Sequence, residues 1–397
     1  MSDFNLGRWE LRRAGARVEP QKKVEPTKRP PTRRGLFVIA VGNSGEEVGL
    51  RMQELAWRDG FDIPICFLNN DAKMPNAIAV RLPDGQTHVL RAEMRLVVGG
   101  EGNTRDQIQD YPLLAQRYSP HTLLRNIPVY QTYNRGGRGG HAMPVISAMD
   151  LDLHIDEVYG FLRKGLSWLR DGATRGDAPA RSDLERILKE RTRKQQATAQ
   201  AWIVAQVGGA SGSFGNASHQ LLPHLTREIL KELGIKSYEL WGFLLGPKAF
   251  TGLTDETQRN YYALLNSLDY MARHGLQRQF INGMNINTAT PSYDRIFLLD
   301  DVLLPRAQAY VTESELHTFF QRAALSAHLL LSTEAWEVIA SHHANPTRDQ
   351  SNQPDARLRM WNTVNGALAG ADHDALAELV ALTQQTQLLD ALVMQLK

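Results

Sequence analysis

Cysteine is nearly absent from this sequence, which holds a single one, Cys66, among 397 residues. One thiol excludes an internal disulfide framework and any metal site built from several cysteines. Long apolar runs are absent as well, because no segment approaches the roughly 18 apolar residues that a membrane-spanning helix needs. The N-terminus carries charge but lacks the apolar stretch of a signal peptide. We therefore expect a cytoplasmic protein without a membrane span.

The formal net charge is only +2, so the chain lacks the broad basic field of nucleic-acid-binding proteins, and we expect no nucleic-acid partner. Positive charge is concentrated in residues 1–34, which hold ten Lys or Arg against four Asp or Glu, together with four prolines. This segment has little periodic apolar patterning and is predicted to be a flexible basic tail. It is either a solvated extension or an arm that binds an acidic partner or an anionic surface.

Apolar runs and helical patterns alternate from residue 35 onward. Strands are predicted at residues 35–41, 63–68, 94–98, 202–207, 240–245 and 295–299, and helices at 155–169, 182–196, 221–233 and 256–273. Continuous apolar runs are typical of buried parallel strands, and their alternation with helices implies a mostly parallel sheet. The sequence therefore predicts an α/β fold with helices on both faces of the sheet, and only helices past residue 312.

Two familiar nucleotide-binding patterns are missing. The sequence contains no G-x-x-x-x-G-K-[ST], which excludes the standard P-loop NTPases. Gly42, Gly45 and Gly49 give the spacing G-x-x-G-x-x-x-G after the first strand, whereas a dinucleotide fingerprint requires G-x-G-x-x-G. A Rossmann-type oxidoreductase that binds NAD(P) is therefore a minor alternative.

Glycine-rich or Asn/Asp loops nevertheless follow four of the predicted strands. They are Gly42-Asn43-Ser44-Gly45, Asn69-Asn70-Asp71, Gly99-Gly100-Glu101-Gly102-Asn103 and Gly208-Gly209-Ala210-Ser211-Gly212-Ser213. In such loops backbone N–H groups can approach phosphate oxygens, and the helix that follows adds a favourable partial charge. Parallel sheets bind ligands at the carboxyl ends of their strands, so the four loops are expected to converge. Any one of them is explained equally well as a tight turn, and a further glycine cluster occupies residues 135–140.

The order of these loops resembles that of the FtsZ/tubulin superfamily. Residues 208–213 resemble its GGGTGSG signature, Asn69 to Ala72 resemble its Asn-Thr-Asp-Ala, and residues 297–304 are similar to its Ile-Pro-Asn-Asp-Arg-Leu-Leu. The resemblance covers about residues 35–332 and is greatest to divergent bacterial tubulin-like proteins. It implies a nucleotide-binding domain at 35–311, a central helix at 312–332 and a small, mainly helical C-terminal region at 333–397.

The resemblance also implies that the chain binds GTP or GDP with Mg²⁺ and forms a homo-oligomer or filament. The implied nucleotide-binding residues are Gly42, Asn43, Ser44, Gly45, Asn70, Asp71, Gly100, Glu101, Gly102, Asn103, Gly208, Gly209, Ala210, Ser211, Gly212, Ser213, Asp255, Arg259 and Asp300. Of these, Asp255 and Arg259 match a family pair that contacts ribose or base, but their i, i+4 spacing also fits a surface ion pair. The protein is either a self-assembling GTPase or a non-hydrolysing, nucleotide-gated scaffold that recruits a partner through its basic tail or its C-terminal helices.

The sequence departs from the family at three places. Ala210 and Ser211 replace a glycine and the threonine of the signature. Residues 320–324 are neutral or basic where the family's central helix offers a carboxylate to guanine, so the choice between guanine and adenine stays open. The acidic hydrolysis loop has no counterpart, because residues 352–355 are typical of a turn, so the sequence does not identify the catalytic residues of a GTPase. Helices are expected at 357–368 and 375–396.

Overall fold

The computed structural model describes the chain, with gaps, from the first predicted strand to residue 363. The described residues are 34–81, 85, 87–99, 104–118, 140, 143–171, 183–197, 199, 201–247, 255–300, 312–332 and 361–363. All of them belong to one unit, Arg33–Lys397. The predicted tail therefore lies outside the described residues, apart from Arg34 at the start of the first strand. None of the described helices combines the length and apolar character that a membrane span requires.

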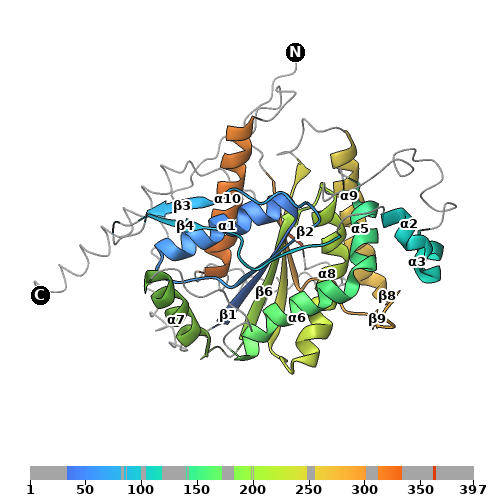
Figure 1. The fold of residues 1–397 in the computed structure, drawn as a ribbon, viewed down its shortest axis with the longest axis horizontal. Helices are drawn as coiled ribbons and strands as arrows, with labels where there is room; N and C mark the ends of the chain where they lie inside the picture. The colour runs from blue at the N-terminus through green and yellow to red at the C-terminus, as the bar shows by residue number, and fades with distance from the viewer. Residues whose placement is uncertain are drawn as a thin grey trace, which may run out of the picture. The chain divides into compact units, whose positions relative to one another are not determined.

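A sheet whose strands all run parallel is the centre of the fold (Figure 1). Among the described residues its order is β11-β10-β7-β6-β1-β2-β5. The strands are β1 (Arg34–Val41), β2 (Ile65–Asn69), β5 (Arg95–Val97), β6 (Ala201–Gly209), β7 (Tyr238–Leu245), β10 (Arg295–Leu299) and β11 (Trp361–Thr363). The six predicted strands are confirmed, with ends shifted by a few residues, because buried parallel strands are apolar on both faces.

Helices cover both faces of the sheet, which confirms the predicted α/β fold (Figure 1). Successive side chains of a strand point to opposite faces, so Phe37 and Ile39 of β1 belong to one buried cluster and Val38 and Ala40 to the other. The first cluster includes residues of α6 (Ile155–Asp171), α8 (Phe214–Glu232) and α9 (Asp255–His274). The second includes residues of α1 (Gly42–Arg58), α7 (Asp183–Ala197) and α10 (Glu313–Ser332).

Smaller elements for which the sequence patterns give no signal surround this core. They are α2 (Thr104–Gln109), α3 (Pro112–Arg117), α5 (Pro144–Leu153), the hairpin of β3 (Ile78–Arg81) with β4 (Thr87–Leu90), and the hairpin of β8 (Leu276–Gln279) with β9 (Asn285–Thr288). The fully buried carboxylate of Asp152 in α5 accepts hydrogen bonds from Arg117 and Arg278, both at 2.6 Å, and from Tyr118 at 2.8 Å. These contacts attach α3 and β8 to α5.

Two sequence predictions need correction. Residues 42–45 were expected to form a glycine loop between strand and helix, but they are the first turn of α1, which begins directly after β1. Gly42 makes this abrupt change of direction with φ +69°, a conformation that glycine adopts without a steric cost. The helix predicted at 357–368 is wrong at Trp361–Thr363, which form β11 beside β10. The rest of the predicted C-terminal helices lies outside the described residues, whereas the predicted central helix is confirmed as α10.

Helix α8 carries two buried histidines toward the segment that precedes β10. The side chain of His219 is 2.6 Å from the hydroxyl of Tyr293, and that of His224 is 3.0 Å from the hydroxyl of Ser292. Burial lowers the pKa of each histidine to about 4, and for His224 the charge of Arg227 adds to this effect. The folded protein therefore holds both rings neutral at pH values where an unfolded chain would protonate them.

We expect the free energy of unfolding to fall as the pH is lowered from about 6.5 to 4, because protons bind the histidines of the unfolded state first. The loss between pH 7 and pH 5 is about 2 kcal/mol for each buried histidine, at about 1.4 kcal/mol per pH unit. In a His224→Gln variant the loss should be about 2 kcal/mol smaller than in the wild type, as measured by urea unfolding at the two pH values. The raised pKa values of Glu46 and Asp62 act in the opposite direction but are common to both proteins. An equal loss in both proteins would show that His224 is protonated in the folded state.

Candidate functional site

The candidate site lies where β1 and β6 end. The two strands are neighbours in parallel register, with Val41 opposite Gly208. The chain leaves β1 for β2 on one side, whereas β6 lies on the other side, so the strand order reverses between β1 and β6. In open parallel sheets, ligands bind outside the carboxyl ends of the strands at such a switch point.

Two helix N-termini meet at this switch point. Helix α1 begins at Gly42, and α8 begins at Phe214, after the loop of residues 210–213. Neither helix has an acidic residue in its first turn or a side-chain hydrogen bond that caps it. The first N–H groups of a helix lack intrahelical partners and carry partial positive charge. The site therefore presents uncompensated donors that favour an anion.

Two glycines allow the helices to start this close to the strands. A Cβ atom on Gly45 would lie 2.4 Å from the carbonyl oxygen of Val207, and one on Gly215 would lie 2.4 Å from that of Gly209. Both distances are shorter than real Cβ contacts, so any side chain would force the helix starts away from the strand ends. Gly45 and Gly215 are thus explained by packing alone.

Packing does not explain Gly212. A Cβ atom there would meet no atom of the described residues within 4 Å, and the residue does not have a positive φ. Gly209 is similar, since its Cβ would lie 3.4 Å from the Ser44 hydroxyl oxygen, which is an ordinary contact. Neither the fold nor the backbone conformation of the described residues therefore requires glycine at 212. Space above the loop does remain open because Gly212 has no side chain.

Donors of the same loop lack partners. The Ser211 hydroxyl is fully buried and makes no hydrogen bond within the described part of the chain. The N–H groups of Ser211 and Gly212 likewise have no partner among the described residues. Buried donors are normally paired, so unpaired ones in a native loop call for an explanation such as a ligand. Ser211, Gly212 and the helix starts of α1 and α8 together form what we call the anion loop site.

Ser213 was expected to contact the phosphates, but its hydroxyl bonds residues of the neighbouring segment 143–147. Its hydroxyl donates to the carbonyl oxygen of Met143 at 2.8 Å and lies 2.5 Å from the Ser147 hydroxyl, which accepts a bond of 2.8 Å from the Asn70 side chain. A Cβ atom on Gly140, the last residue of the second glycine cluster, would lie 1.8 Å from the Ser213 hydroxyl oxygen. That cluster therefore ends against the anion loop site, a contact the sequence patterns do not indicate.

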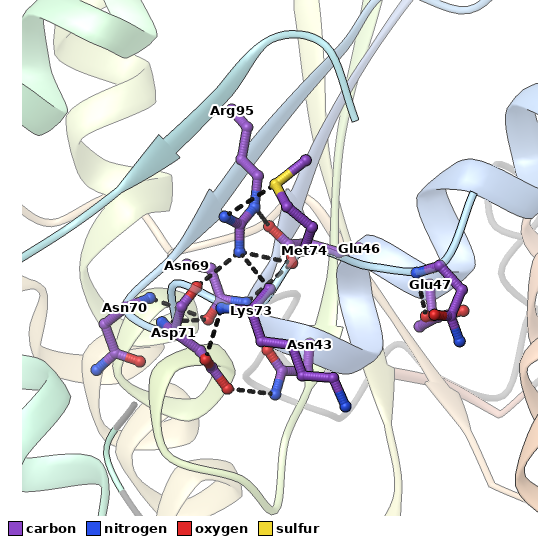
Figure 2. Close-up of polar contacts among 10 residues, drawn as sticks. Asn43, Glu46, Glu47, Asn69, Asn70, Asp71, Lys73, Met74 and Arg95 are labelled. Carbon is purple, nitrogen blue, oxygen red and sulfur yellow. Dashed lines mark hydrogen bonds and ion pairs between the residues drawn. The ribbon is translucent and has the colours of Figure 1, made fainter. Parts of the chain in front are cut away.

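The end of β2 is held by a second set of contacts, which Figure 2 shows. The side-chain amide of Asn69 donates to Asn43 at 2.5 Å and to Glu46 at 2.9 Å, and Asn43 donates to Asp71 at 3.1 Å. Asn43 and Asp71 thus face each other across the start of α1, and Asp71 stays partly exposed. Both were expected near the nucleotide, and the structure brings them together.

A buried ion pair lies beneath these residues. Arg95 of β5 bonds Glu46 of α1 at 2.6 Å, and their side chains are 6% and 1% exposed (Figure 2). Burial raises the pKa of Glu46, and the Arg95 guanidinium opposes this shift. Arg95 also donates to the carbonyl oxygens of Asp71 at 2.7 Å and Lys73 at 3.0 Å. The pair therefore fixes both the start of α1 and the loop after β2.

The other expected residues lie apart from this centre or outside the described residues. Asn70 is buried, and its amide bonds Ser147 and, at 2.9 Å, Asp150. Arg259 is exposed on α9, and Asp300 follows β10. The Asp300 carboxyl group lies against the end of β7, since a Cβ atom added at Gly246 would lie 2.5 Å from its Cγ atom. Residues 100–103 and the side chain of Asp255 lie outside the described residues.

We expect Arg95→Met to lower the free energy of unfolding by about 3 kcal/mol, because removal of one partner leaves a buried carboxylate without its counter-charge. The double variant Glu46→Gln/Arg95→Met should lose less than Arg95→Met alone. Arg58→Met is the matched control, since Arg58 pairs with Glu54 on the surface of α1 with its own side chain 55% exposed, and an exposed pair contributes only about 0–1 kcal/mol. Equal losses at Arg95 and Arg58, measured by chemical unfolding, would contradict the assignment of a buried pair.

No family model and no curated protein matches this chain. Solved structures do match it. CetZ1 from Haloferax volcanii, a GDP-bound monomer, is 12% identical with a TM-score of 0.40 and is matched over 77% of this chain and 63% of its own. CetZ2 from the same organism, in a GTPγS-bound protofilament, is 15% identical with a TM-score of 0.38, over 77% and 62%. TubZ from Bacillus thuringiensis serovar israelensis, in a GTPγS-form protofilament, is 12% identical with a TM-score of 0.35, over 75% and 56%. The chain spans less than two thirds of the length of each of these proteins.

Proposed function

We propose that this chain binds a guanine nucleotide, with the phosphates over residues 209–212 and between the N-termini of α1 and α8. The observation that carries the proposal is the anion loop site. At one point of the sheet it combines two helix starts without acidic residues, unpartnered donors and a glycine with open space above it. The helix starts and the N–H donors favour a phosphate group over a neutral ligand, and the open space allows it to approach the backbone.

Within this proposal, the N–H groups of Ser211 and Gly212 donate to phosphate oxygens, and so do those of the first turn of α1. The Ser211 hydroxyl gains the partner that it lacks among the described residues. Mg²⁺ would neutralise part of the phosphate charge. No group of three His, Cys, Asp or Glu side chains in the described segments is placed to hold a metal ion, so Mg²⁺ would be held chiefly by phosphate oxygens and water, as is usual for this ion.

Asp71 and Asp300 are the carboxylates that we propose for the sugar and the base. Asp71 is partly exposed beside the start of α1, and Asp300 follows β10, two strands away from β6. Arg259 and Asp255 at the start of α9 stay proposed contacts of the ribose or base. The preference for guanine rests on the resemblance of the loops to the FtsZ/tubulin superfamily.

Self-assembly is the second part of the proposal and rests on the same resemblance. A self-assembling GTPase would stabilise the phosphoryl transition state by electrostatic contacts and an oriented water. A scaffold would keep its nucleotide intact. We expect phosphate release per subunit to be slow, because we identify no residue near the loop, among those described, that would activate water. For a self-assembling GTPase the rate should rise steeply with protein concentration, because assembly brings subunits together. Bound GTP that stays uncleaved at every concentration would favour the scaffold.

We expect Gly212→Val to weaken GTP binding at least about tenfold, or about 1.4 kcal/mol, because the side chain would fill the open space above the loop. The melting temperature of the unliganded protein should stay nearly unchanged, since a Cβ atom added at residue 212 meets no described atom within 4 Å. Titration calorimetry with GTP, ATP and NAD measures the affinities, and GTP should bind most tightly.

Gly160→Val is the matched control for this experiment. Gly160 is exposed on α6, and a Cβ atom added there would, as at Gly212, meet no atom within 4 Å, so its replacement should leave GTP affinity unchanged. If Gly212→Val lowers the melting temperature strongly, Gly212→Ala provides the smaller change. Unaltered GTP affinity in both Gly212 variants would place the phosphates elsewhere, and equal affinity for ATP and GTP would remove the guanine assignment alone.

A further inference from the structure

Side chains from two helices bond the carbonyl groups of Ala210 and Ser211, at the anion loop site. Asn216 of α8 donates from its amide to the carbonyl oxygen of Ala210 at 2.7 Å. Asn260 of α9 donates to the carbonyl oxygen of Ser211 at 3.2 Å. These two carbonyls belong to consecutive peptide groups, so the asparagines fix two neighbouring peptide planes.

Because peptide groups are planar, the two contacts also fix the directions of the N–H groups of Ser211 and Gly212. In a trans peptide the C=O and the following N–H point in opposite directions. The carbonyl of Ala210 shares its plane with the N–H of Ser211, and the carbonyl of Ser211 shares its plane with the N–H of Gly212. Both N–H groups therefore point away from Asn216 and Asn260. These are the N–H groups without a partner among the described residues.

The orientation of Asn216 is itself determined. Its side chain is 1% exposed. Its amide nitrogen donates both to Ala210 and to the backbone carbonyl oxygen of Asn260, at 2.9 Å, while its side-chain oxygen accepts a bond of 3.0 Å from Gln220. A reversed amide would lose all three bonds, because nitrogen would face nitrogen and oxygen would face oxygen. The start of α9 is thus attached to the loop through two asparagines.

We propose that Asn216 and Asn260 are positioning residues, which hold the peptide groups of residues 210–212 so that the N–H groups of Ser211 and Gly212 face the phosphates. This inference rests on the proposed nucleotide binding. If a peptide plane were free to rotate, a carbonyl oxygen could replace an N–H group at the site and repel a phosphate. The two asparagines therefore act through the loop and need not touch the nucleotide.

The test compares Asn260→Ala with Asn266→Ala, an exposed asparagine further along α9. Affinities for GTP and for guanosine, which lacks phosphates, are measured by titration calorimetry or competition, together with the melting temperature. Asn260→Ala should weaken GTP binding at least about tenfold, or about 1.4 kcal/mol, and change guanosine binding less than about twofold. Asn266→Ala should change neither affinity.

The outcomes separate this inference from the proposed function. If wild-type protein binds GTP and Asn260→Ala binds it equally well, the inference fails and the proposed function stands. If GTP and guanosine affinities fall together, or if Asn266→Ala shows the same loss, Asn260 acts on general stability and the inference fails. If wild-type protein binds no guanine nucleotide, the proposed function fails and the inference with it. Asn216→Ala, checked for folding by its melting temperature, should repeat the selective loss for GTP.

Discussion

Contact between helix backbone and strand backbone at the switch point is the constraint on which the rest of the structure depends. Helices α1 and α8 both start against the end of β6 because Gly45 and Gly215 have no side chains, and an added Cβ would lie 2.4 Å from a carbonyl oxygen of β6 in either place. This approach brings two positive helix ends together at one edge of the sheet. Everything that we assign to the site follows from that convergence.

Polar side chains then hold the surrounding loops in place. The pair of Glu46 and Arg95 connects α1 to β5 and to the loop after β2. Such a buried pair requires close hydrogen bonds on both partners to offset the cost of removing them from water, and Arg95 satisfies this by donating to two backbone carbonyls as well. Asp152 does the same for the outer elements α3 and β8. Two buried carboxylates, Glu46 and Asp152, thus connect elements that are distant in the sequence.

The sequence predicted six strands of the sheet because each lies in a short, continuous apolar run, whereas β11 has only three residues, is not an apolar run and was predicted as part of a helix. It predicted less well where short elements alternate between partly buried and exposed residues, as in β3 and β4. The glycine loops indicated the edge of the sheet at which the site lies, but their residues have different roles. Gly212 leaves open space above the loop, Gly45 is required for packing, and the Ser213 hydroxyl bonds the carbonyl oxygen of Met143. Partners such as Asn260 and Ser211, 49 residues apart, leave no local pattern in the sequence.

The hydrogen bonds from Asn70 through Ser147 and Ser213 to the carbonyl of Met143 form a directed series, in which each hydroxyl accepts one bond and donates the next. The three side chains of the series, those of Asn70, Ser147 and Ser213, are buried. Ordering of a backbone residue costs about 1–2 kcal/mol of conformational entropy. The loop is ordered when the chain folds, so ligand binding does not include this cost. A ligand that binds the loop finds it already ordered, and the free energy of its contacts appears as affinity and is not spent on arranging the loop.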